Sequence, residues 1–431
     1  MKKRLITIGS ILFLIFTVII TASVVDTTPK WETATGGTYV VTFADYDGTI
    51  LKEVTCTVGE ACVIVPPASP DNKDNCEFIR WNLWQDHWSE IDGDVTIKAI
   101  YTLDNRLAVI GGRPIVFYSV FIMLGIMLAL LFGLKEAKRT GLDRDALTDG
   151  FLWIVPLAIL GSRLWYVAFE WESFVYGGFF PSLLRILGFQ SGQLDFSSFG
   201  LSGLAIHGAF TTALVGGLIF VKVRKLSPWK VLDLIAAGFL FAQTFGRWGN
   251  FLNQEAHGGL VGGLTGGLSL EQQYNFLRYT LHIPEFIANN MYMVANGGTA
   301  AVTGYYHPTF LYELLLNWIG FGIILILRRI KNVRFGEMMP FYLVWYGSVR
   351  IFIETMRTDP LIGEIFGITF KAAIMTSSLM ILGGIALDLL IRFVFKTGFY
   401  GDVPSAFGNE PQDESPAEAP AEPQAPTDAA V

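Results

Sequence analysis

Charged residues are scarce in this chain. Lys, Arg, Asp and Glu together make up 16% of its 431 residues, whereas hydrophobic residues make up 52%, and the mean hydropathy is +0.45. This composition excludes an ordinary soluble enzyme and is typical of a polytopic membrane protein. The formal net charge of −7 does not indicate a nucleic-acid partner.

Cysteine is also rare, and its positions exclude one kind of chemistry. The three cysteines are Cys56, Cys62 and Cys76, all outside the long apolar runs, so a cysteine nucleophile supplied by the membrane core is excluded. If this segment faces outward, a disulfide is permitted, but three cysteines leave one over and the sequence does not choose the pair. The sequence has neither a metal-ligand cluster nor a nucleotide-binding loop, so we expect no metal and no cofactor.

Long apolar runs are plentiful. A helix needs about 20 residues to cross a hydrocarbon layer of about 30 Å. Eight segments meet this length approximately: 5–25, 115–134, 150–168, 203–221, 230–247, 308–327, 337–356 and 369–395. They predict an all-α polytopic membrane protein with a seven-helix core and an N-terminal anchor at 1–25. The basic start and the small residues Ala22 and Ser23 also fit a cleaved signal peptide.

The distribution of Lys and Arg over the short connections predicts the orientation. Cations follow the second, fourth and sixth segments, and these loops should be cytoplasmic. They are Lys135, Lys138, Arg139, Arg144, Lys222, Arg224, Lys225, Arg328, Arg329, Lys331 and Arg334. Both termini are then cytoplasmic, and residues 26–114 are extracytoplasmic.

Two parts of the chain differ from the predicted membrane domain at 110–396. Residues 37–102 alternate β-branched and aromatic positions between turn signals such as "DYDG" and "DGD", which predicts a small extracytoplasmic β domain. The pattern "VTFADYDGTILKEVT…IKAIYT" resembles internalin B type repeats of bacterial surface proteins, which implies a binding or spacer module whose partner is unknown. Residues 397–431 are rich in Pro, Ala and Glu and predict a disordered cytoplasmic tail.

Several ionisable side chains fall inside the predicted membrane segments, where each should be paired or face a polar cavity. They are Arg163, His207, Arg247, Glu313, Arg350 and Glu354. Tyr346, Arg350, Glu354 and Arg357 follow one another at spacings of four, four and three residues, so they share one helix face. Structural roles are alternatives: an ion pair for Arg350 and Glu354, a cation snorkelling to the interface for Arg163, and a satisfied core histidine for His207. Together, however, the positive centres would repel one another without an anion, which a lipid phosphate supplies.

The stretch "FGRWGNFLNQEAHGG", residues 245–259, ends the fifth segment. Arg247 is followed by Asn250 and Asn253 at spacings of three, so a continuous helix would place all three on one face. Gly246 and Gly249 leave the backbone open to a ligand. Because guanidinium groups bind phosphate oxygens bidentately and amides orient hydroxyls, we expect a phosphate and polyol site at the headgroup level.

At every fixed position this stretch matches G-R-x-G-N-F-x-N-x-E-x-x-G, so the chain resembles the prolipoprotein diacylglyceryl transferase family. Four further blocks fall in the family's order over roughly 110–396, and its count of seven helices agrees with the prediction. These blocks and the signature add Tyr118, Gly208, Glu255, Gly258, His307 and Glu313. The chain departs from the usual His-Gly-Gly at His207-Gly208-Ala209. The added methyl group puts a close backbone approach there in question.

The resemblance implies a bacterial plasma-membrane enzyme without a cofactor. Its partners would be phosphatidylglycerol, prolipoprotein lipobox peptides and membrane lipids. The lipobox cysteine thiol would attack the glyceryl carbon of phosphatidylglycerol, giving a thioether and releasing glycerol phosphate. His207 is the candidate base, because a thiol of pKa about 8.5 is mostly protonated at neutral pH.

The remaining residues fit binding and positioning. Arg247 and Arg350 would stabilise the departing phosphate, and Glu354 would orient Arg350. Tyr118 and the two asparagines would position the headgroup, while Arg163, Tyr346 and Arg357 would contact the lipid. The competing hypotheses are a lipid or anion transporter that binds phosphate without chemistry, and a non-catalytic surface scaffold that uses the β domain.

Overall fold

A computed structural model describes residues 28–71, 76–110, 113–189, 191–194, 203–263, 267–295, 302–357, 362–365 and 368–403. The predicted anchor at 1–25 and residues 404–431 of the predicted tail lie outside the described residues. The chain divides into two compact units. The first comprises Met1–Leu131, Ala236–Ile324 and Met339–Leu389, and the second comprises Phe132–Ile235, Leu325–Met338 and Leu390–Val431.

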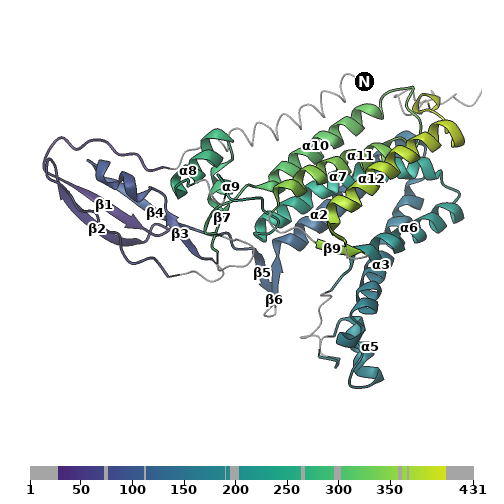
Figure 1. Ribbon diagram of the computed structural model, residues 1–431, viewed down its shortest axis with the longest axis horizontal. Helices are drawn as coiled ribbons and strands as arrows, with labels where there is room; N and C mark the ends of the chain where they lie inside the picture. The colour runs from purple at the N-terminus through teal and green to yellow at the C-terminus, as the bar shows by residue number, and fades with distance from the viewer. Residues whose placement is uncertain are drawn as a thin grey trace, which may run out of the picture. The chain divides into compact units, whose positions relative to one another are not determined.

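The first unit begins with a small β domain, here called the β module (residues 28–105). Its sheet has the order β2-β1-β4-β3, with β1 and β4 parallel and the other neighbours antiparallel. The strands are β1 (Thr38–Ala44), β2 (Ile50–Thr57), β3 (Phe78–Trp81) and β4 (Val95–Tyr101), with a 3-10 turn η1 (Gln85–Glu90) between β3 and β4. The small β domain expected from the sequence is therefore present (Figure 1).

Alternation along the strands builds the core of the β module. Val41 and Phe43 on β1 and Ile97 on β4 are fully buried, and the intervening residues point outward. Trp88 packs edge-on against Phe43 with ring centroids 5.2 Å apart. Cys56 at the end of β2 forms a disulfide with Cys62, which resolves the pairing that the sequence left open.

The rest of the first unit is mainly helical. The main helices that contribute to it are α2 (Phe117–Thr140), α7 (Pro228–Leu252), α10 (Thr309–Leu327), α11 (Met338–Met356) and α12 (Ala372–Leu389). The segment between α7 and α10, here called the outer loop (residues 253–308), holds α8 (Leu270–Asn275), the π-helical turn η3 (Phe276–Thr280), α9 (Glu285–Asn289), β7 (Tyr292–Met293) and β8 (Gly304–Tyr305). Hairpins β5 (Arg106–Ile110) with β6 (Arg113–Val116) and β9 (Ile362–Ile365) with β10 (Ile368–Lys371) precede α2 and α12.

The second unit is built around α3 (Arg144–Phe169) and α6 (Ile206–Val223), which lie side by side (Figure 1). Its other elements are α4 (Trp171–Phe174), α5 (Phe179–Leu187), the π-helical turn η4 (Leu390–Phe395) and the 3-10 turn η5 (Tyr400–Asp402). Tyr400 is fully buried, and its hydroxyl donates to Asp233 Oδ2 at 2.8 Å. Packed structure thus extends past residue 396 to residue 403.

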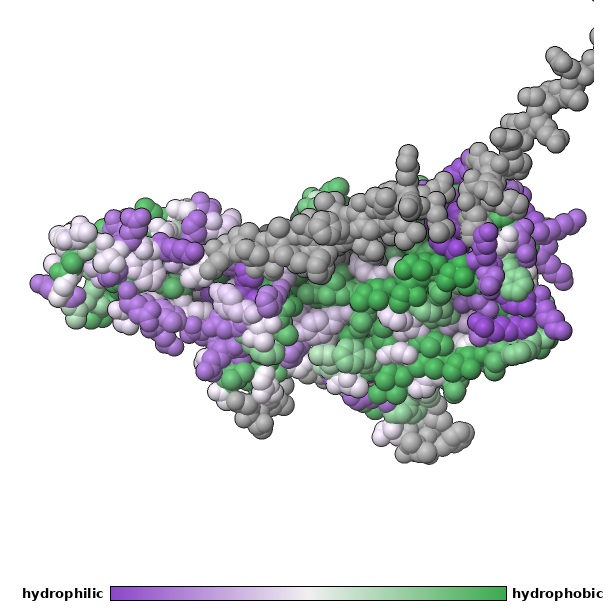
Figure 2. All heavy atoms as spheres, turned by 90° about the horizontal axis from the view of Figure 1, so that it is seen from above, coloured by the Kyte–Doolittle hydropathy of each residue, from purple (hydrophilic) through white to green (hydrophobic). Residues whose placement is uncertain are grey.

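Four of the described helices are long and apolar enough to cross a membrane: Phe117–Thr140, Arg144–Phe169, Thr309–Leu327 and Ala372–Phe395. The surface over the helices is largely hydrophobic, whereas that of the β module is mainly hydrophilic (Figure 2). The chain is therefore a mostly helical membrane protein with a small sheet region. The shorter α6 and the more polar α7 and α11, which carry Arg247, Arg350 and Glu354, are not among the four.

Candidate functional site

Six side chains of the first unit form a continuous chain of polar contacts, here called the polar chain. It runs through Glu255, Asn250, Arg247, Glu313, Arg350 and Glu354. Asn250 Nδ2 donates to Glu255 Oε1 at 2.7 Å, and Arg247 Nη1 donates to Asn250 Oδ1 at 3.0 Å. Arg247 Nη2 lies 2.7 Å from Glu313 Oε1, whose other oxygen lies 3.6 Å from Arg350 Nη1. Arg350 Nη2 lies 2.9 Å from Glu354 Oε2, so one carboxylate, Glu313, joins two arginines.

Three helices supply five of these six side chains, and Glu255 follows the end of α7. Arg247 and Asn250 lie in the last turns of α7, Glu313 in the second turn of α10, and Arg350 and Glu354 one turn apart on α11. The i,i+4 spacing on α11 produces the contact directly, as the sequence predicted. Tyr346 stacks on Tyr342, one turn earlier on α11, with ring centroids 5.7 Å apart.

Burial and charge are balanced in the polar chain. The side chains of Glu313 and Glu354 are each 1% exposed, whereas those of Arg247 and Arg350 are each 18% exposed. The two guanidinium groups are matched by two nearly inaccessible carboxylates, and the arginines keep an open side. The ion pair of Arg350 with Glu354, considered above as a structural alternative, is formed.

The end of α7 limits which polar residues share its face. The helix stops at Leu252, and the Asn253 amide donates to Gly249 O while the Glu255 amide donates to Asn250 O. Gln254 and Ala256 have φ angles of +54° and +58°, a left-handed conformation that ends the helix. Asn250 therefore lies on the helix, and Asn253 lies just beyond it.

The glycines of the signature serve different purposes. A Cβ on Gly249 would lie 2.6 Å from Tyr118 Cδ2, so this glycine admits the Tyr118 ring. A Cβ on Gly246 would meet no atom within 4 Å, which agrees with an open approach. A Cβ on Gly258 would lie 2.9 Å from His307 Cβ.

Gly258 and His307 join two ends of the outer loop. The Gly258 amide donates to His307 O at 2.8 Å, and the backbone of Gly258 also forms an isolated bridge with that of Arg357. His307 Nδ1 lies 3.1 Å from the hydroxyl of Tyr312. These contacts fasten residues 253–258, here called the signature loop, to the start of α10 and the end of α11.

Three predicted site residues lie in the second unit. Arg163 is 4% exposed and donates to the carbonyls of Arg185 at 2.8 Å, Ile186 at 3.1 Å and Gly203 at 3.3 Å. It thereby fastens the end of α5 and the segment that precedes α6. His207 is an exposed residue in the first turn of α6. Gly208 faces α3 so closely that a Cβ would overlap Gly161 O, so its close approach is to a helix.

The second unit also holds two buried acidic residues that the sequence analysis missed. Glu136 Oε2 lies 2.8, 3.3 and 3.5 Å from the guanidinium groups of Arg139, Arg328 and Arg329. Asp233 is fully buried and accepts from the amides of Gly336 and Met338 and from Tyr400. Asp233 could have been found, since it is an acid inside the predicted segment 230–247. Glu136 could not have been found in this way, because it lies just after the predicted segment 115–134, among the cations of a connecting loop.

No three His, Cys, Asp or Glu side chains converge on a possible metal position in the described residues. The arrangement has two partly exposed guanidinium groups that could contact an anion, oriented by glutamates and an asparagine. The helices of this membrane protein therefore carry a buried, charge-balanced polar cluster with two partly exposed arginines.

Comparison with known proteins gives the family. The sequence model of the prolipoprotein diacylglyceryl transferase family matches residues 106–390, about two thirds of the chain. The chain belongs to the prolipoprotein diacylglyceryl transferase family.

Individual relatives agree with this match. The chain is 38% identical over 265 residues to the phosphatidylglycerol–prolipoprotein diacylglyceryl transferase of Bacillus cytotoxicus, covering 62% of this chain and 85% of that protein. It is 36% identical over 304 residues to the protein of the same name from Listeria innocua, covering 70% of this chain and 95% of that protein. Both names are those of a transferase and not of a transporter or a scaffold.

Proposed function

We propose that this chain transfers the diacylglyceryl group of phosphatidylglycerol to the lipobox cysteine of prolipoproteins. The bond between the glyceryl carbon and the phosphate oxygen breaks, a thioether forms, and glycerol phosphate leaves with the electron pair. The thiol proton goes to a base. Family membership and the names of the relatives support this reaction. Among this chain's own residues, the supporting observation is the pair of partly exposed arginines joined by Glu313.

Arg247 and Arg350 act as a phosphate clamp in this proposal. The phosphate is a singly charged diester in the lipid and gains a second charge as the carbon–oxygen bond breaks. Guanidinium groups fixed in advance stabilise that developing charge without having to reorganise. Glu313, Glu354, Asn250 and Glu255 hold the clamp in position.

The remaining site residues take supporting roles. Tyr118, Asn253, Tyr346 and Arg357 bind the lipid headgroup, and Gly246 leaves the helix open beside Arg247. Gly249, Gly258 and His307 shape the signature loop, and Gly208 brings α6 close to α3. Arg163 acts through its carbonyl contacts, by fastening the segment that leads to His207. His207 accepts the thiol proton.

The proposed location is the bacterial plasma membrane. Seven helices cross it, preceded by an anchor at 1–25, with the membrane domain at 110–396 and both termini in the cytoplasm. Residues 26–114, including the β domain expected at 37–102, are extracytoplasmic, and residues 397–431 are cytoplasmic. After reduction of the disulfide, a membrane-impermeant maleimide should label Cys62 in intact cells. Labelling that requires lysis would contradict this orientation.

The activity is tested with purified protein, phosphatidylglycerol and a lipobox peptide. The peptide should gain the mass of one diacylglyceryl group, and glycerol phosphate should appear in equal amount. A peptide in which serine replaces the cysteine is the control, because its hydroxyl is a much weaker nucleophile. If folded protein leaves the cysteine peptide unmodified, the proposed function is wrong.

A further inference from the structure

Arg80 of the β module bonds to the outer loop. Arg80 Nε donates to the Tyr305 hydroxyl at 3.0 Å, and Nη2 donates to Asn289 Oδ1 at 2.9 Å. The Arg80 guanidinium also packs against the rings of Trp84 and Tyr274, at 4.4 and 4.6 Å from their centroids. Cation–π contacts of this kind add to the two hydrogen bonds. The module is thus a fixed wall and not a free stalk.

A second contact and a shared core extend this attachment. His87 Nε2 on η1 lies 2.7 Å from Glu271 Oε1 on α8. Trp84 and Leu103 of the β module pack against the core of the outer loop, which includes Tyr274 and Tyr305. The same core reaches Phe251 in the last turn of α7, four residues after Arg247. One continuous apolar core therefore connects the β module to the helix that carries the clamp.

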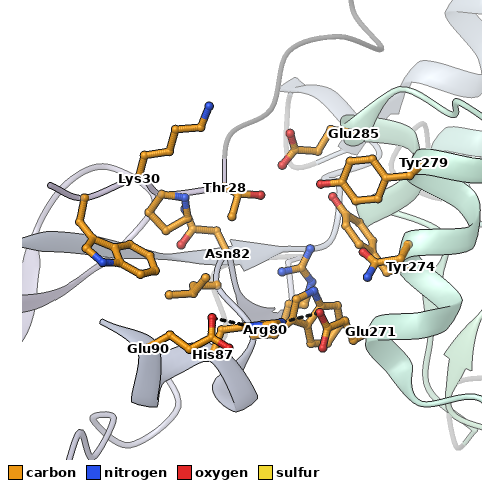
Figure 3. A pocket seen from close by; sticks show the side chains of 15 residues that line it. Thr28, Lys30, Arg80, Asn82, His87, Glu90, Glu271, Tyr274, Tyr279 and Glu285 are labelled. Carbon is orange, nitrogen blue, oxygen red and sulfur yellow. Dashed lines mark hydrogen bonds and ion pairs between the residues drawn. The ribbon is translucent and has the colours of Figure 1, made fainter. Parts of the chain in front are cut away.

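A cavity of about 560 Å³ lies between the β module and the outer loop (Figure 3). Lys30 and Asn82 stand on the module wall, and Tyr274, Tyr279 and Glu285 stand on the opposite helical wall (Figure 3). The volume falls within the range of about 300–1,000 Å³ that is usual for ligand sites. One wall lies outside residues 106–390, so the cavity needs a part of the chain that the family match does not include.

We propose that this cavity binds an extended peptide, the segment that follows the lipobox cysteine in the prolipoprotein. The inference rests on the proposed function and names a further substrate contact for it. The aromatic rings of Trp31 and Tyr279 suit apolar side chains, while Lys30 and Glu285 bring charges of both signs to opposite walls. A peptide carries groups of all these kinds. Glu90, Glu271 and Glu285 disfavour a purely anionic polymer, and Lys30 and Arg80 disfavour a purely cationic one, so the lining favours a chain that carries both charges.

The proposal predicts a dependence on substrate length. Two lipobox peptides are compared. One ends at the residue after the cysteine. The other continues for about 20 residues, which gives it a maximum extended reach of about 3.3 Å per residue beyond the cysteine. The full chain should show a KM for the longer peptide about five- to tenfold lower, as expected when a few aromatic and charged contacts are added. The kcat should be the same for both, because the reacting atoms are the same.

Paired variants separate the cavity from general effects on the module. Lys30→Glu and Tyr279→Ala should raise the KM for the longer peptide toward the KM for the shorter peptide. The KM for the shorter peptide should not change. The matched controls are Lys98→Glu and Tyr46→Ala, exposed residues of the β module that do not line the cavity. The melting temperature of each variant should match that of the parent.

A binding measurement tests the peptide site independently of the transfer activity. The fluorescently labelled downstream segment alone, without cysteine, should bind the full chain, and Lys30→Glu should weaken that binding by a similar factor. If neither lipobox peptide is modified but the segment binds through Lys30, the proposed function fails and the cavity is still a peptide site. Equal KM values for both peptides in the parent, no segment binding, or equal effects of cavity and control variants would overturn the inference. Displacement of the segment by an uncharged wall glycan would also overturn it.

Discussion

Glu313 gives the sharpest test of the polar chain. Its carboxylate joins Arg247 and Arg350 and is 1% exposed, and Glu313→Gln removes the charge with little change of volume. Breaking a buried ion pair by removing one partner costs about 3–5 kcal/mol, because the other charge is left uncompensated. Here two guanidinium groups lose the carboxylate they share. At about 2–4 °C per kcal/mol, the melting temperature should fall by roughly 6–20 °C.

Phosphatidylglycerol should partly reverse this loss, because a lipid phosphate in the clamp replaces the missing negative charge. A ligand present at about 100 times its Kd stabilises a protein by about 2.7 kcal/mol. The stabilisation should be larger in Glu313→Gln than in the parent, since the variant has more to gain from an anion. The assay is thermal unfolding in detergent with phosphatidylglycerol, and with a diacylglycerol, which has no phosphate, as the control lipid.

A matched variant guards against a general effect of losing an acid. Asp149 forms an exposed ion pair with Arg224, and Asp149→Asn should cost less than about 1 kcal/mol and show no lipid rescue. The reasoning is refuted if Glu313→Gln melts with the parent, or if both lipids raise its melting temperature equally.

Three further predictions address other residues. Arg247→Lys should lower kcat/KM about a hundredfold, because a point charge cannot replace a bidentate guanidinium donor. His207→Asn should keep some activity, and that activity should rise with pH. The opposite ranking of the two variants in pH–rate profiles would overturn the assigned roles. Asn317 on α10 is fully buried, and neither of its side-chain amide atoms has a hydrogen-bond partner among the described residues. In denaturant titrations, Asn317→Leu should therefore leave the free energy of unfolding unchanged or raise it by about 1 kcal/mol. A clear loss of stability would contradict this. Hydrogen bonds with Glu271 and Glu90 raise the pKa of His87, so its contribution to docking is complete below about pH 6.5 and is lost as pH rises through the raised pKa. Hydrogen exchange of the α8 amides, corrected for intrinsic rates, should increase over that range in the parent but not in His87→Gln.

Local patterns predicted a large part of this structure. The spacing of Arg350 and Glu354 gave their contact on α11, and the alternation around Val41 and Phe43 gave an inward face on β1. The long apolar runs gave a helical membrane protein. Each of these features depends on residues that are neighbours in sequence or along one element, so periodicity is enough to find them.

Features that depend on distant residues were not predicted. Nothing near Gly249 indicates that Tyr118, 131 positions earlier, fills the space beside it. The end of α7 rests on left-handed conformations at Gln254 and Ala256, residue types that do not favour them. The docking of Arg80 on Tyr305 joins residues 225 positions apart. Such contacts are decided by tertiary packing, which a single sequence does not display.

The balanced charge of the clamp bears on how it could favour reaction over tight lipid binding. A lone guanidinium in a low-dielectric site is costly, and Glu313 and Glu354 remove that cost before lipid arrives. They also compete with the lipid phosphate for the same donors. A singly charged diester competes poorly, and the doubly charged leaving group competes better, so stabilisation is larger in the transition state than in the bound lipid.

Removing one competitor should therefore tighten lipid binding at the expense of turnover. In Glu354→Gln, Arg350 keeps a hydrogen-bond acceptor but loses a charged partner, so the Kd for phosphatidylglycerol, measured without peptide, should fall. The kcat should fall as well, by about tenfold, which corresponds to about 1.4 kcal/mol of lost preference for the more highly charged state. Weaker lipid binding with an unchanged kcat would show that Glu354 only orients Arg350. Glu255→Gln is the matched control: Glu255 reaches Arg247 through Asn250, so this variant should leave the Kd nearly unchanged.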